Sequence, residues 1–423
     1  MTLLVITYFF PPMVSPRAFR WYSITKWWAQ HGHEVTVICA GDPAGVKARL
    51  IPGLSVWVVD SRLDRLRTRL GAPMDGQSFR GWSVLQGMLK RVWQSVYWPD
   101  YACVWFGPAL MAAERALRNQ KYDALVTVSL PFTVHLIGWR LTRKFPYLPW
   151  IADIGDPFSF TEGVPQNNRF IYHWLNRLVE GRALEQTKAI VVTTTAARDR
   201  YAMLFPRLEQ KIIAIPPICP SEELDLQDRT RVFPANDKIR LVFLGTLYRE
   251  IRSPAFLLAV FDRLQETRLA DRLELHFFGD VNDCLEFFKP LRHMIGWKIF
   301  LHGTVDRKHA LKAMVEAHVL VNIGNATRYQ LPSKVVEYAC LGKPILNLVR
   351  DHGDSSEIIL RTYPAAYTVL ERPLDRGTLE SLVQFIGSPP QVPLEALADW
   401  RRPFTVSAVS EAYLQLMLSS SIP

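Results

Sequence analysis

Short apolar runs that alternate with helical patterns constrain the fold of this chain more than any other feature of its sequence. Residues 3–7 form a short apolar strand pattern, residues 17–30 repeat their apolar side chains at helical spacing, and residues 34–40 are the next predicted strand. A strand, a helix and a strand in this order form a βαβ unit, in which the two strands are parallel. Because the alternation continues along the chain, we predict an α/β protein with doubly wound parallel sheets.

The alternation is interrupted by a polar, proline-flanked stretch at residues 218–238, which we interpret as a linker. A chain of 423 residues is long enough for two domains with a core each. We therefore predict one Rossmann-like domain at residues 1–217 and a second at residues 239–393. Residues 394–423 are predicted to be a C-terminal helix and tail that can cross back to the first domain.

The positive charge of the chain indicates an anionic ligand or surface. The sequence has 50 Lys and Arg against 40 Asp and Glu, a formal net charge of +10 and a pI near 9.4. Nucleotide sugars, nucleic acid and an anionic membrane face all fit this charge. We predict no nucleic-acid partner, because no helix-turn-helix, RNA-recognition or zinc-finger pattern accompanies the basic residues. The G-x-G-x-x-G of a dinucleotide site is also absent, which argues against a nicotinamide dehydrogenase.

The cysteines and the hydropathy pattern favour a cytoplasmic protein. Because the cysteines are scattered and lack metal-ligand spacing, we expect neither a disulfide framework nor a zinc site. They are Cys39, Cys103, Cys219, Cys284 and Cys340. No apolar run reaches the roughly 18 residues of a membrane span, and the N-terminus enters a strand without a basic leader.

A basic stretch rich in aromatic residues, 61–105, raises the question of membrane contact. Arg62, Arg65 and Arg69 share one face of a predicted helix, and Trp82 and Trp93 belong to an apolar stripe further on. Such a helix is typical of peripheral contact with an anionic membrane, here the inner face. It is also typical of a helix that packs on its own domain and exposes a basic back, so both interpretations stay open.

Three groups capable of acid–base chemistry follow adjacent predicted strands of the first half. His135 lies in the first turn of the helix that follows the strand at 124–128, and Asp153 and Asp156 lie at the end of the strand at 149–153. The carboxyl ends of parallel strands meet at one edge of a sheet. We predict that the three side chains are catalytic groups that orient sugar hydroxyls or handle a proton. The alternative is that Asp153 caps a turn and that backbone satisfies His135.

The second half offers a site for an anion at residues 329–346. An apolar strand is followed by a polar loop that Pro332 ends, and a short helix begins with Ser333 as its predicted N-cap. Backbone N–H groups at a helix N-terminus attract phosphate, so Ser333 and Lys334 are predicted to hold one. Glu337 lies one turn further on and can reach a ligand's hydroxyls. The alternative is an ordinary strand–helix unit with surface charges.

Several segments resemble, in order and spacing, glycosyltransferase family 4, whose members have the GT-B fold of two Rossmann-like domains facing across a cleft. Residues 149–158, Pro-Trp-Ile-Ala-Asp-Ile-Gly-Asp-Pro-Phe, resemble the PW-x-x-D-x-R-D-P-W segment of a bacterial branch of that family. The other matching segments are residues 8–12, 28–37, 243–248 with Arg252, 332–338, and 342–344.

The resemblance implies transfer of a sugar, with retention, from a nucleoside-diphosphate donor. The acceptor would be a polysaccharide, a lipid-linked glycan or a small molecule such as a secondary metabolite, bound by the first domain. The family needs no cofactor and no bound metal, because basic residues of the second domain stabilise the leaving diphosphate.

The resemblance also assigns roles on the donor side. Arg252 matches the family's phosphate-contacting lysine, with Arg249 as a helper. Glu337 matches the glutamate on the ribose hydroxyls, and Gly303 and Thr304 would lie near the base. The full predicted donor set is Gly245, Thr246, Arg249, Arg252, Gly303, Thr304, Pro332, Ser333, Lys334 and Glu337.

The chain departs from the family pattern at three charged positions. Gly155 occupies the position of the family's arginine between the two aspartates. Thr246 occupies the position of the arginine after the first glycine of the second domain, and Tyr329 that of the first glutamate of an E-x7-E pattern. These departures motivate a second hypothesis, a non-catalytic nucleotide-sugar-binding subunit that scaffolds a partner transferase. A sugar-nucleotide epimerase on the same fold is a third hypothesis. The sequence does not support it, because it places no acidic pair for proton abstraction next to the donor site.

Overall fold

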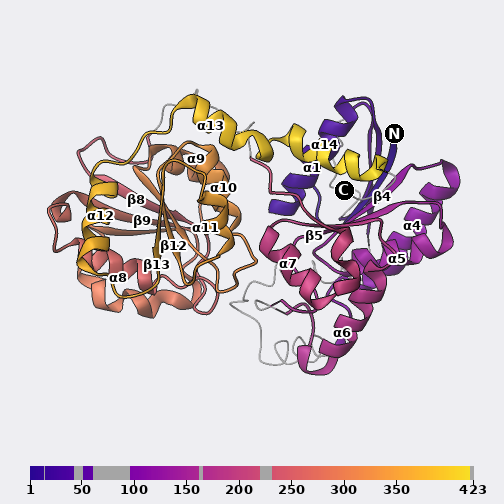
Figure 1. Ribbon diagram of the computed structural model, residues 1–423, viewed down its shortest axis with the longest axis horizontal. Coiled ribbons are helices and arrows are strands. Elements are labelled where there is room, and N and C mark those ends of the chain that lie inside the picture. The colour runs from indigo at the N-terminus through magenta and orange to yellow at the C-terminus, as the bar shows by residue number, and fades with distance from the viewer. Residues whose placement is uncertain (14, 42–50, 61–95, 162–164, 220–230, 420–423) are drawn as a thin grey trace. The chain divides into compact units, whose positions relative to one another are not determined.

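The computed structural model describes the chain as two compact units (Figure 1). It describes all residues except 14, 42–50, 61–95, 162–164, 220–230 and 420–423. Unit 1 comprises Met1–Pro216 and Val406–Pro423, and unit 2 comprises Pro217–Thr405. Each unit contains a parallel sheet with helices, which confirms the predicted α/β class with two Rossmann-like domains.

The sheet of unit 1 has, among the described residues, seven parallel strands in the order β3-β2-β1-β4-β5-β6-β7. The strands are β1 (Thr2–Thr7), β2 (Glu34–Ala40), β3 (Leu54–Val59), β4 (Ala124–Val128), β5 (Trp150–Ile154), β6 (Ala189–Val192) and β7 (Ile212–Ala214). All residues of β4, β5 and β6 are buried, as expected for a sheet covered on both faces. The strand order reverses between β1 and β4, where open α/β sheets bind their ligands.

Helices with clear local signals connect these strands. The helices are α1 (Pro16–Gln30), α4 (Phe106–Asn119), α5 (Thr133–Lys144), α6 (Arg169–Leu184), α7 (Thr195–Leu204) and α14 (Val406–Leu418), with 3-10 turns η2 (Cys103–Trp105) and η3 (Pro206–Lys211). The N-terminus of α1 is fixed by Ser15, whose hydroxyl accepts from the N–H of Ala18 at 3.0 Å, and by Pro16 in the first turn.

The sheet of unit 2 repeats this architecture with six parallel strands, within the described residues, in the order β10-β9-β8-β11-β12-β13. The strands are β8 (Ile239–Leu244), β9 (Leu273–Phe278), β10 (Ile299–Gly303), β11 (Val319–Ile323), β12 (Ile345–Val349) and β13 (Ala366–Leu370). The helices are α8 (Ala255–Leu264), α9 (Arg307–Glu316), α10 (Ser333–Cys340), α11 (Ser355–Leu360), α12 (Arg376–Gly387) and α13 (Leu394–Arg401), with 3-10 segments η4 (Ala270–Arg272), η5 (Asn282–Met294) and η6 (Arg402–Phe404). The order reverses between β8 and β11.

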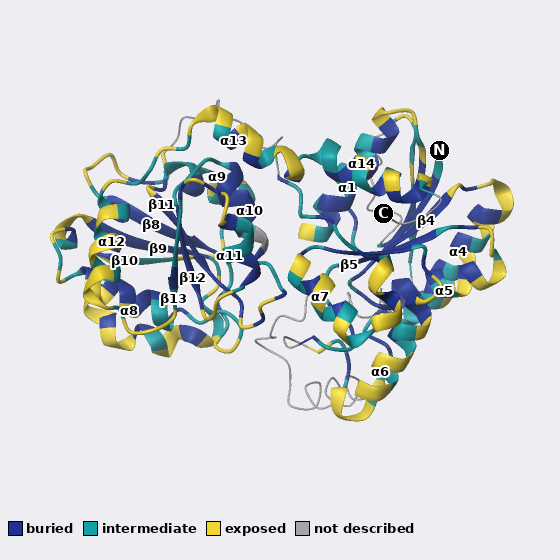
Figure 2. Cartoon of the chain, viewed as in Figure 1, coloured by how far each residue is buried: buried dark blue, intermediate teal, exposed yellow. Residues whose placement is uncertain are grey.

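The core of unit 2 is divided by its sheet, because successive residues of a strand point to opposite faces. Leu241 and Phe243 of β8 pack in one cluster with residues of α8 and α12. Val242 and Leu244 pack in another, with residues of α9 and α10. Figure 2 shows the strands as buried and the outer sides of the helices as exposed. Burial of apolar side chains on both faces therefore fixes which strand ends lie together.

The C-terminal segment divides between the units. Helix α13 and η6 belong to unit 2, whereas α14 belongs to unit 1, so the predicted return of the C-terminal helix to the first domain is confirmed. Tyr413 of α14 is fully buried and makes edge contacts with the rings of Trp21 (5.1 Å between centroids) and Trp28 (6.3 Å) of α1. The indole N–H of Trp28 also donates to the carbonyl of Ser410.

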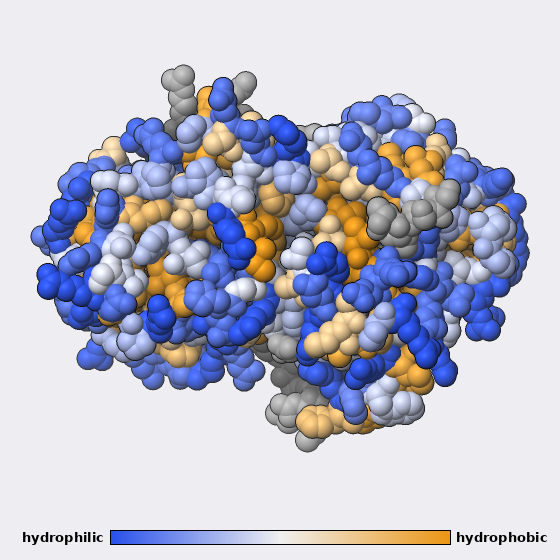
Figure 3. Space-filling model, in the orientation of Figure 1, coloured by the Kyte–Doolittle hydropathy of each residue, from blue (hydrophilic) through white to orange (hydrophobic). Residues whose placement is uncertain are grey.

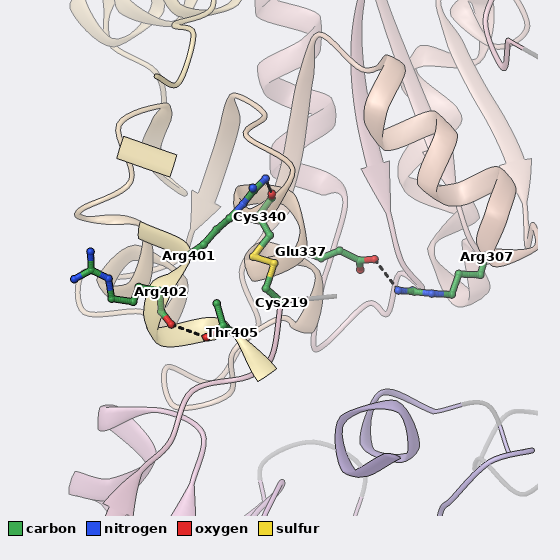
Figure 4. Close-up of a disulfide and its surroundings, with 7 residues drawn as sticks. All are labelled: Cys219, Arg307, Glu337, Cys340, Arg401, Arg402 and Thr405. Carbon is green, nitrogen blue, oxygen red and sulfur yellow. Dashed lines mark hydrogen bonds and ion pairs between the residues drawn. A yellow bond between two sulfur atoms is a disulfide. The ribbon is translucent and has the colours of Figure 1, made fainter. Parts of the chain in front are cut away.

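The expectation of no disulfide is wrong for one pair of cysteines. Cys219 and Cys340 form a disulfide with a Cα–Cα distance of 6.0 Å, although 121 residues separate them in sequence (Figure 4). Cys219 lies beside η6, where its N–H donates to the carbonyl of Phe404. Cys340 ends α10, and its carbonyl accepts from the guanidinium of Arg401, the residue just before η6, so the two cysteines meet. Scattered positions in sequence do not measure separation in space.

The segment that raised the question of membrane contact falls mostly outside the described residues, since 61–95 are not described. Within the described part of the chain, no helix combines the length and the apolar character needed to cross a bilayer.

Tyr413→Ala is expected to lower the free energy of unfolding by about 3 kcal/mol, because it removes a buried aromatic side chain between α14 and α1. Glu411→Ala, at an exposed position of the same helix, should change it by less than about 0.5 kcal/mol. Urea unfolding of both variants measures the difference. Equal losses would contradict the packing of α14 on unit 1.

Candidate functional site

The carboxylate of Asp153 lies at the end of β5 and is fully buried. Its Oδ2 accepts from Arg17 Nη1 at 3.0 Å and from the indole N–H of Trp21 at 2.6 Å. Its Oδ1 is buried without a hydrogen bond to any described residue. Both partners come from α1, so the first helix of the chain supplies the cation and the N–H donor that pair with this buried carboxylate.

Gly155 explains how the arginine reaches this place. A Cβ built on Gly155 would overlap the guanidinium of Arg17, so only glycine leaves the space that the guanidinium fills. The resembling family branch has an arginine at position 155. Here a cation lies at the same strand end but comes from α1. Sequence reasoning missed Arg17, and its only signal was the missing arginine at 155.

His135 does not present its imidazole to solvent. It is fully buried in the first turn of α5, and its Nδ1 lies 2.8 Å from the hydroxyl of Thr127, which also accepts from the indole N–H of Trp150. Burial lowers its pKa to about 3, so the ring is neutral. A side chain, rather than backbone, thus satisfies one ring nitrogen. This environment suits a positioning role better than proton exchange with an acceptor.

The loop that carries Asp156 is held by a buried glutamate of α6. Glu180 accepts from the N–H of Ser159 at 3.0 Å and of Phe158 at 3.4 Å, and from the hydroxyl of Tyr201 at 2.8 Å. Burial raises the pKa of Glu180, and these hydrogen bonds oppose the rise. Asp156 is partly exposed at the start of this loop. Glu180 is a second residue that sequence reasoning missed.

Arg252 lies where the strand order of unit 2 reverses. Its Nε and Nη2 donate to Asn325 Oδ1 at 3.2 and 2.8 Å, and its Nη1 would lie 3.2 Å from a Cβ built on Gly245. Gly245 follows β8 and Asn325 follows β11. Burial lowers the pKa of Arg252, while Tyr338 and Tyr248 oppose this shift. A largely desolvated cation therefore lies at the carboxyl edge of the sheet.

A second group of charges surrounds Glu337. Its buried carboxylate accepts from Lys334 Nζ at 2.6 Å and forms an ion pair with Arg307 Nη2 at 3.2 Å, as Figure 4 shows for Arg307. Lys334 and Glu337 are one turn apart on α10, and Arg307 begins α9. Burial raises the pKa of Tyr338; the charge of Glu337 adds to this rise and that of Arg252 opposes it, so both groups lie near this tyrosine. Sequence reasoning missed Arg307.

The start of α10 differs by one residue from the prediction. Pro332, with φ −58° and ψ 118°, occupies the N-cap position and Ser333 is the first helical residue, so the predicted Ser333 cap is wrong. The helix begins here because the N–H of Val335 already bonds to the carbonyl of Pro332. The backbone N–H groups of Ser333 and Lys334 then belong to the first turn, which lacks partners within the helix.

The other predicted donor residues divide into two groups. Thr246 follows Gly245 at the end of β8, and Gly303 and Thr304 are exposed at the end of β10, so these lie at the carboxyl edge. Arg249 does not join them. It forms an ion pair with Glu286 and donates to Asp283, both on η5. Among the described residues, no group of three or more His, Cys, Asp or Glu side chains could hold a metal ion.

Gly155→Ala is expected to lower the free energy of unfolding by about 1–3 kcal/mol, because the new methyl group must displace the Arg17 guanidinium from Asp153. In the Arg17→Ala background the same substitution should have a much smaller effect. Urea unfolding of the four proteins gives the coupling. Additive losses would contradict the overlap of the two side chains.

Comparison with known proteins places this geometry in context. Residues 18–217 match the family model of the glycosyl transferase 4-like domain. No curated protein sequence matches the chain. The chain is similar in structure to sucrose-phosphate synthase from Thermosynechococcus elongatus, with a TM-score of 0.64 at 13% identity over 98% of both chains. It is also similar to Anabaena HepE in complex with UDP and glucose, with a TM-score of 0.62 at 12% identity over 98% of both chains.

The UDP-GlcNAc 2-epimerase from Methanocaldococcus jannaschii is similar as well, with a TM-score of 0.53 at 14% identity over 99% of both chains. At such identities the likeness shows the fold, which is the predicted GT-B type, and this fold serves both transferases and an epimerase. The sequence match of residues 18–217 is the finding that supports a glycosyltransferase, of the family 4-like kind.

Proposed function

We propose that the chain transfers a sugar, with retention, from a nucleoside-diphosphate sugar to a polysaccharide, lipid-linked or small-molecule acceptor. The observation that carries this proposal is the set of cations at the carboxyl edge of the unit 2 sheet: Arg252, held by Asn325, and Lys334 and Arg307, both paired with Glu337. Several cations beside a helix N-terminus suit a diphosphate. The family match and the resemblance along the chain support the same activity; retention rests on the resemblance alone.

In this proposal the diphosphate binds between Arg252 and the first turn of α10. Arg252 is pre-organised, because Asn325 Oδ1 accepts from two N–H groups of its guanidinium. A guanidinium has five N–H donors, so the others could bind a phosphate. The N–H groups of Ser333 and Lys334 add the helix dipole. These groups would stabilise the charge that develops as the sugar leaves, in place of a metal ion.

In this proposal Glu337 accepts a hydrogen bond from a ribose hydroxyl, which requires one of its two cationic partners to move away. Lys334 and Arg307 both bind the carboxylate in the structure. When the diphosphate attracts Lys334, Glu337 keeps Arg307 as its partner and can accept from a ribose hydroxyl. Gly303 and Thr304, at the end of β10, would then border the base.

The acceptor is assigned to unit 1, where Asp156 and the Arg17–Asp153 pair lie at the end of β5. Asp156 would orient an acceptor hydroxyl, and Asp153, through Arg17, would keep a cation at this strand end. His135 would support the strand through Thr127 and Trp150. The leaving phosphate oxygen itself would take the acceptor's proton, as the resemblance implies.

A non-catalytic nucleotide-sugar-binding subunit remains the second candidate, because Thr246 and Tyr329 stand where the family pattern has charged residues. The two candidates differ in turnover. A thermal-shift screen with UDP, GDP, ADP and dTDP sugars identifies the donor, since a ligand that binds only the folded protein raises Tm. Hydrolysis or transfer of that donor by the isolated chain then excludes the scaffold, whereas binding without turnover supports it.

Arg252→Ala and Lys334→Ala are each expected to raise the Kd of the donor by tenfold or more, because each removes a charge-assisted contact worth about 1.5–3 kcal/mol. Arg249→Ala is the matched control, since the structure directs this arginine to η5. Calorimetric titration measures the Kd, and urea unfolding checks that the variants fold. Unchanged affinity in both test variants, or an equal loss in Arg249→Ala, would place the diphosphate elsewhere.

A further inference from the structure

Helix α6 has two faces of opposite character. Its inner face is buried and carries Asn176 and Glu180 into unit 1. Its outer face is a ridge of large apolar side chains that are exposed to solvent: Phe170 (100% exposed), Ile171 (52%), Trp174 (60%) and Leu178 (41%). Phe170, Trp174 and Leu178 are spaced by four residues and so lie one above the other. We call these four residues the α6 ridge.

Cations border the α6 ridge. Arg169, Arg177 and Arg182 are exposed on this helix, and at 100° per residue Arg177 and Arg182 fall on opposite sides of the ridge. The one carboxylate within α6 is Glu180, which is buried and faces inward. Figure 2 shows the outer side of α6 as exposed, and Figure 3 shows hydrophobic and strongly hydrophilic residues side by side at the surface over it.

The neighbouring helix extends the same surface. The guanidinium of Arg177 donates to the carbonyl of Leu204 at 3.4 Å, which places the end of α7 beside α6. Met203 of α7 is 60% exposed, and Arg207 follows it on η3. Of the acids nearby in sequence, Glu185 is the exposed C-cap of α6, Asp199 is paired with Arg198, and Glu209 lies on η3.

We propose that the α6 ridge docks unit 1 on an anionic lipid bilayer. Within Arg169–Leu184 the exposed face has apolar side chains flanked by arginines and no carboxylate, and the first exposed carboxylate on that side is the C-cap Glu185. This pattern matches a membrane surface, where the ridge enters the acyl boundary and the cations meet lipid phosphates. Tryptophan at such a position suits the interface, because its ring is apolar and its N–H is polar. A cationic segment of this chain or a second copy of this face would place arginine against arginine.

The inner face of α6 connects this surface to the proposed acceptor side. Glu180 holds the N–H groups of Phe158 and Ser159, in the loop that begins at Asp156. One helix diameter, about 10 Å, therefore separates the docking face from this loop. A lipid-linked acceptor held in the same bilayer would need to rise by only a short distance to reach it.

Vesicle flotation of the full chain tests the proposal. The protein is expected to float at low salt with phosphatidylcholine vesicles that contain phosphatidylglycerol, and to be released by high salt or by omitting the anionic lipid. Phe170→Ser with Trp174→Ser should reduce the bound fraction by tenfold or more, and Arg177→Glu with Arg182→Glu should do the same. Trp297→Ser, which alters a tryptophan of similar exposure (58%) in unit 2, should bind like the unaltered chain.

The proposal is overturned if Phe170→Ser with Trp174→Ser leaves vesicle binding unaltered, or if the unaltered chain does not bind anionic vesicles. Concentration-dependent self-association that the same double substitution abolishes would also overturn it, because the ridge would then be a protein interface. Donor binding, followed by thermal shift, should be equal in the unaltered chain and the double variant. Failure of membrane docking is thus distinguishable from failure of the proposed donor site.

Discussion

Both candidate sites depend on one constraint: charged side chains are buried away from water at the carboxyl ends of the strands. Asp153 is buried with Arg17, Glu337 is buried between Lys334 and Arg307, and Arg252 is held by Asn325. A buried charge is tolerated only when it is paired or hydrogen-bonded, so each of these groups is fixed in direction before any ligand arrives. Such fixed dipoles and charges need little rearrangement when a substrate develops charge beside them.

The same pairing means that, in the proposed donor site, a diphosphate would compete with partners inside the protein. Lys334 and Arg307 both pair with the carboxylate of Glu337, so these three groups have a formal net charge of +1. The guanidinium of Arg252 adds another positive charge near Tyr338. In the proposed donor site, an incoming diphosphate would therefore meet an excess of positive charge and not a neutralised surface. Lys334 is the partner that would change in this proposal, because it lies in the first turn of α10 and its flexible side chain is partly exposed. Arg307 can then stay with the carboxylate.

The strands and helices could be predicted from apolar runs and capping signals, because these depend on residues close in sequence. Pairings across the chain could not. Arg17 meets Asp153 across 136 residues, and Cys219 meets Cys340 across 121. Arg249 shows the limit even at short range. It is three residues from Arg252, but the backbone pairing of Tyr248 with Arg252 closes a tight turn. The Arg249 guanidinium pairs with Glu286 and donates to the backbone carbonyl of Asp283, both on η5. Local sequence places a residue near a site but does not decide which way its side chain points.

The departures from the family pattern do not all carry the same weight. Gly155 removes an arginine from the sequence of that segment, but Arg17 returns a guanidinium to the same strand end, so this position retains its charge. The cation of the pattern is therefore supplied from another position in the sequence, and it is not lost. Thr246 and Tyr329 lie instead in unit 2, where Arg252 matches a basic residue that the pattern already contains and so does not replace the arginine missing at Thr246. The argument for an inactive scaffold therefore depends on these two positions, because only there is the charge of the pattern without a counterpart that we can name.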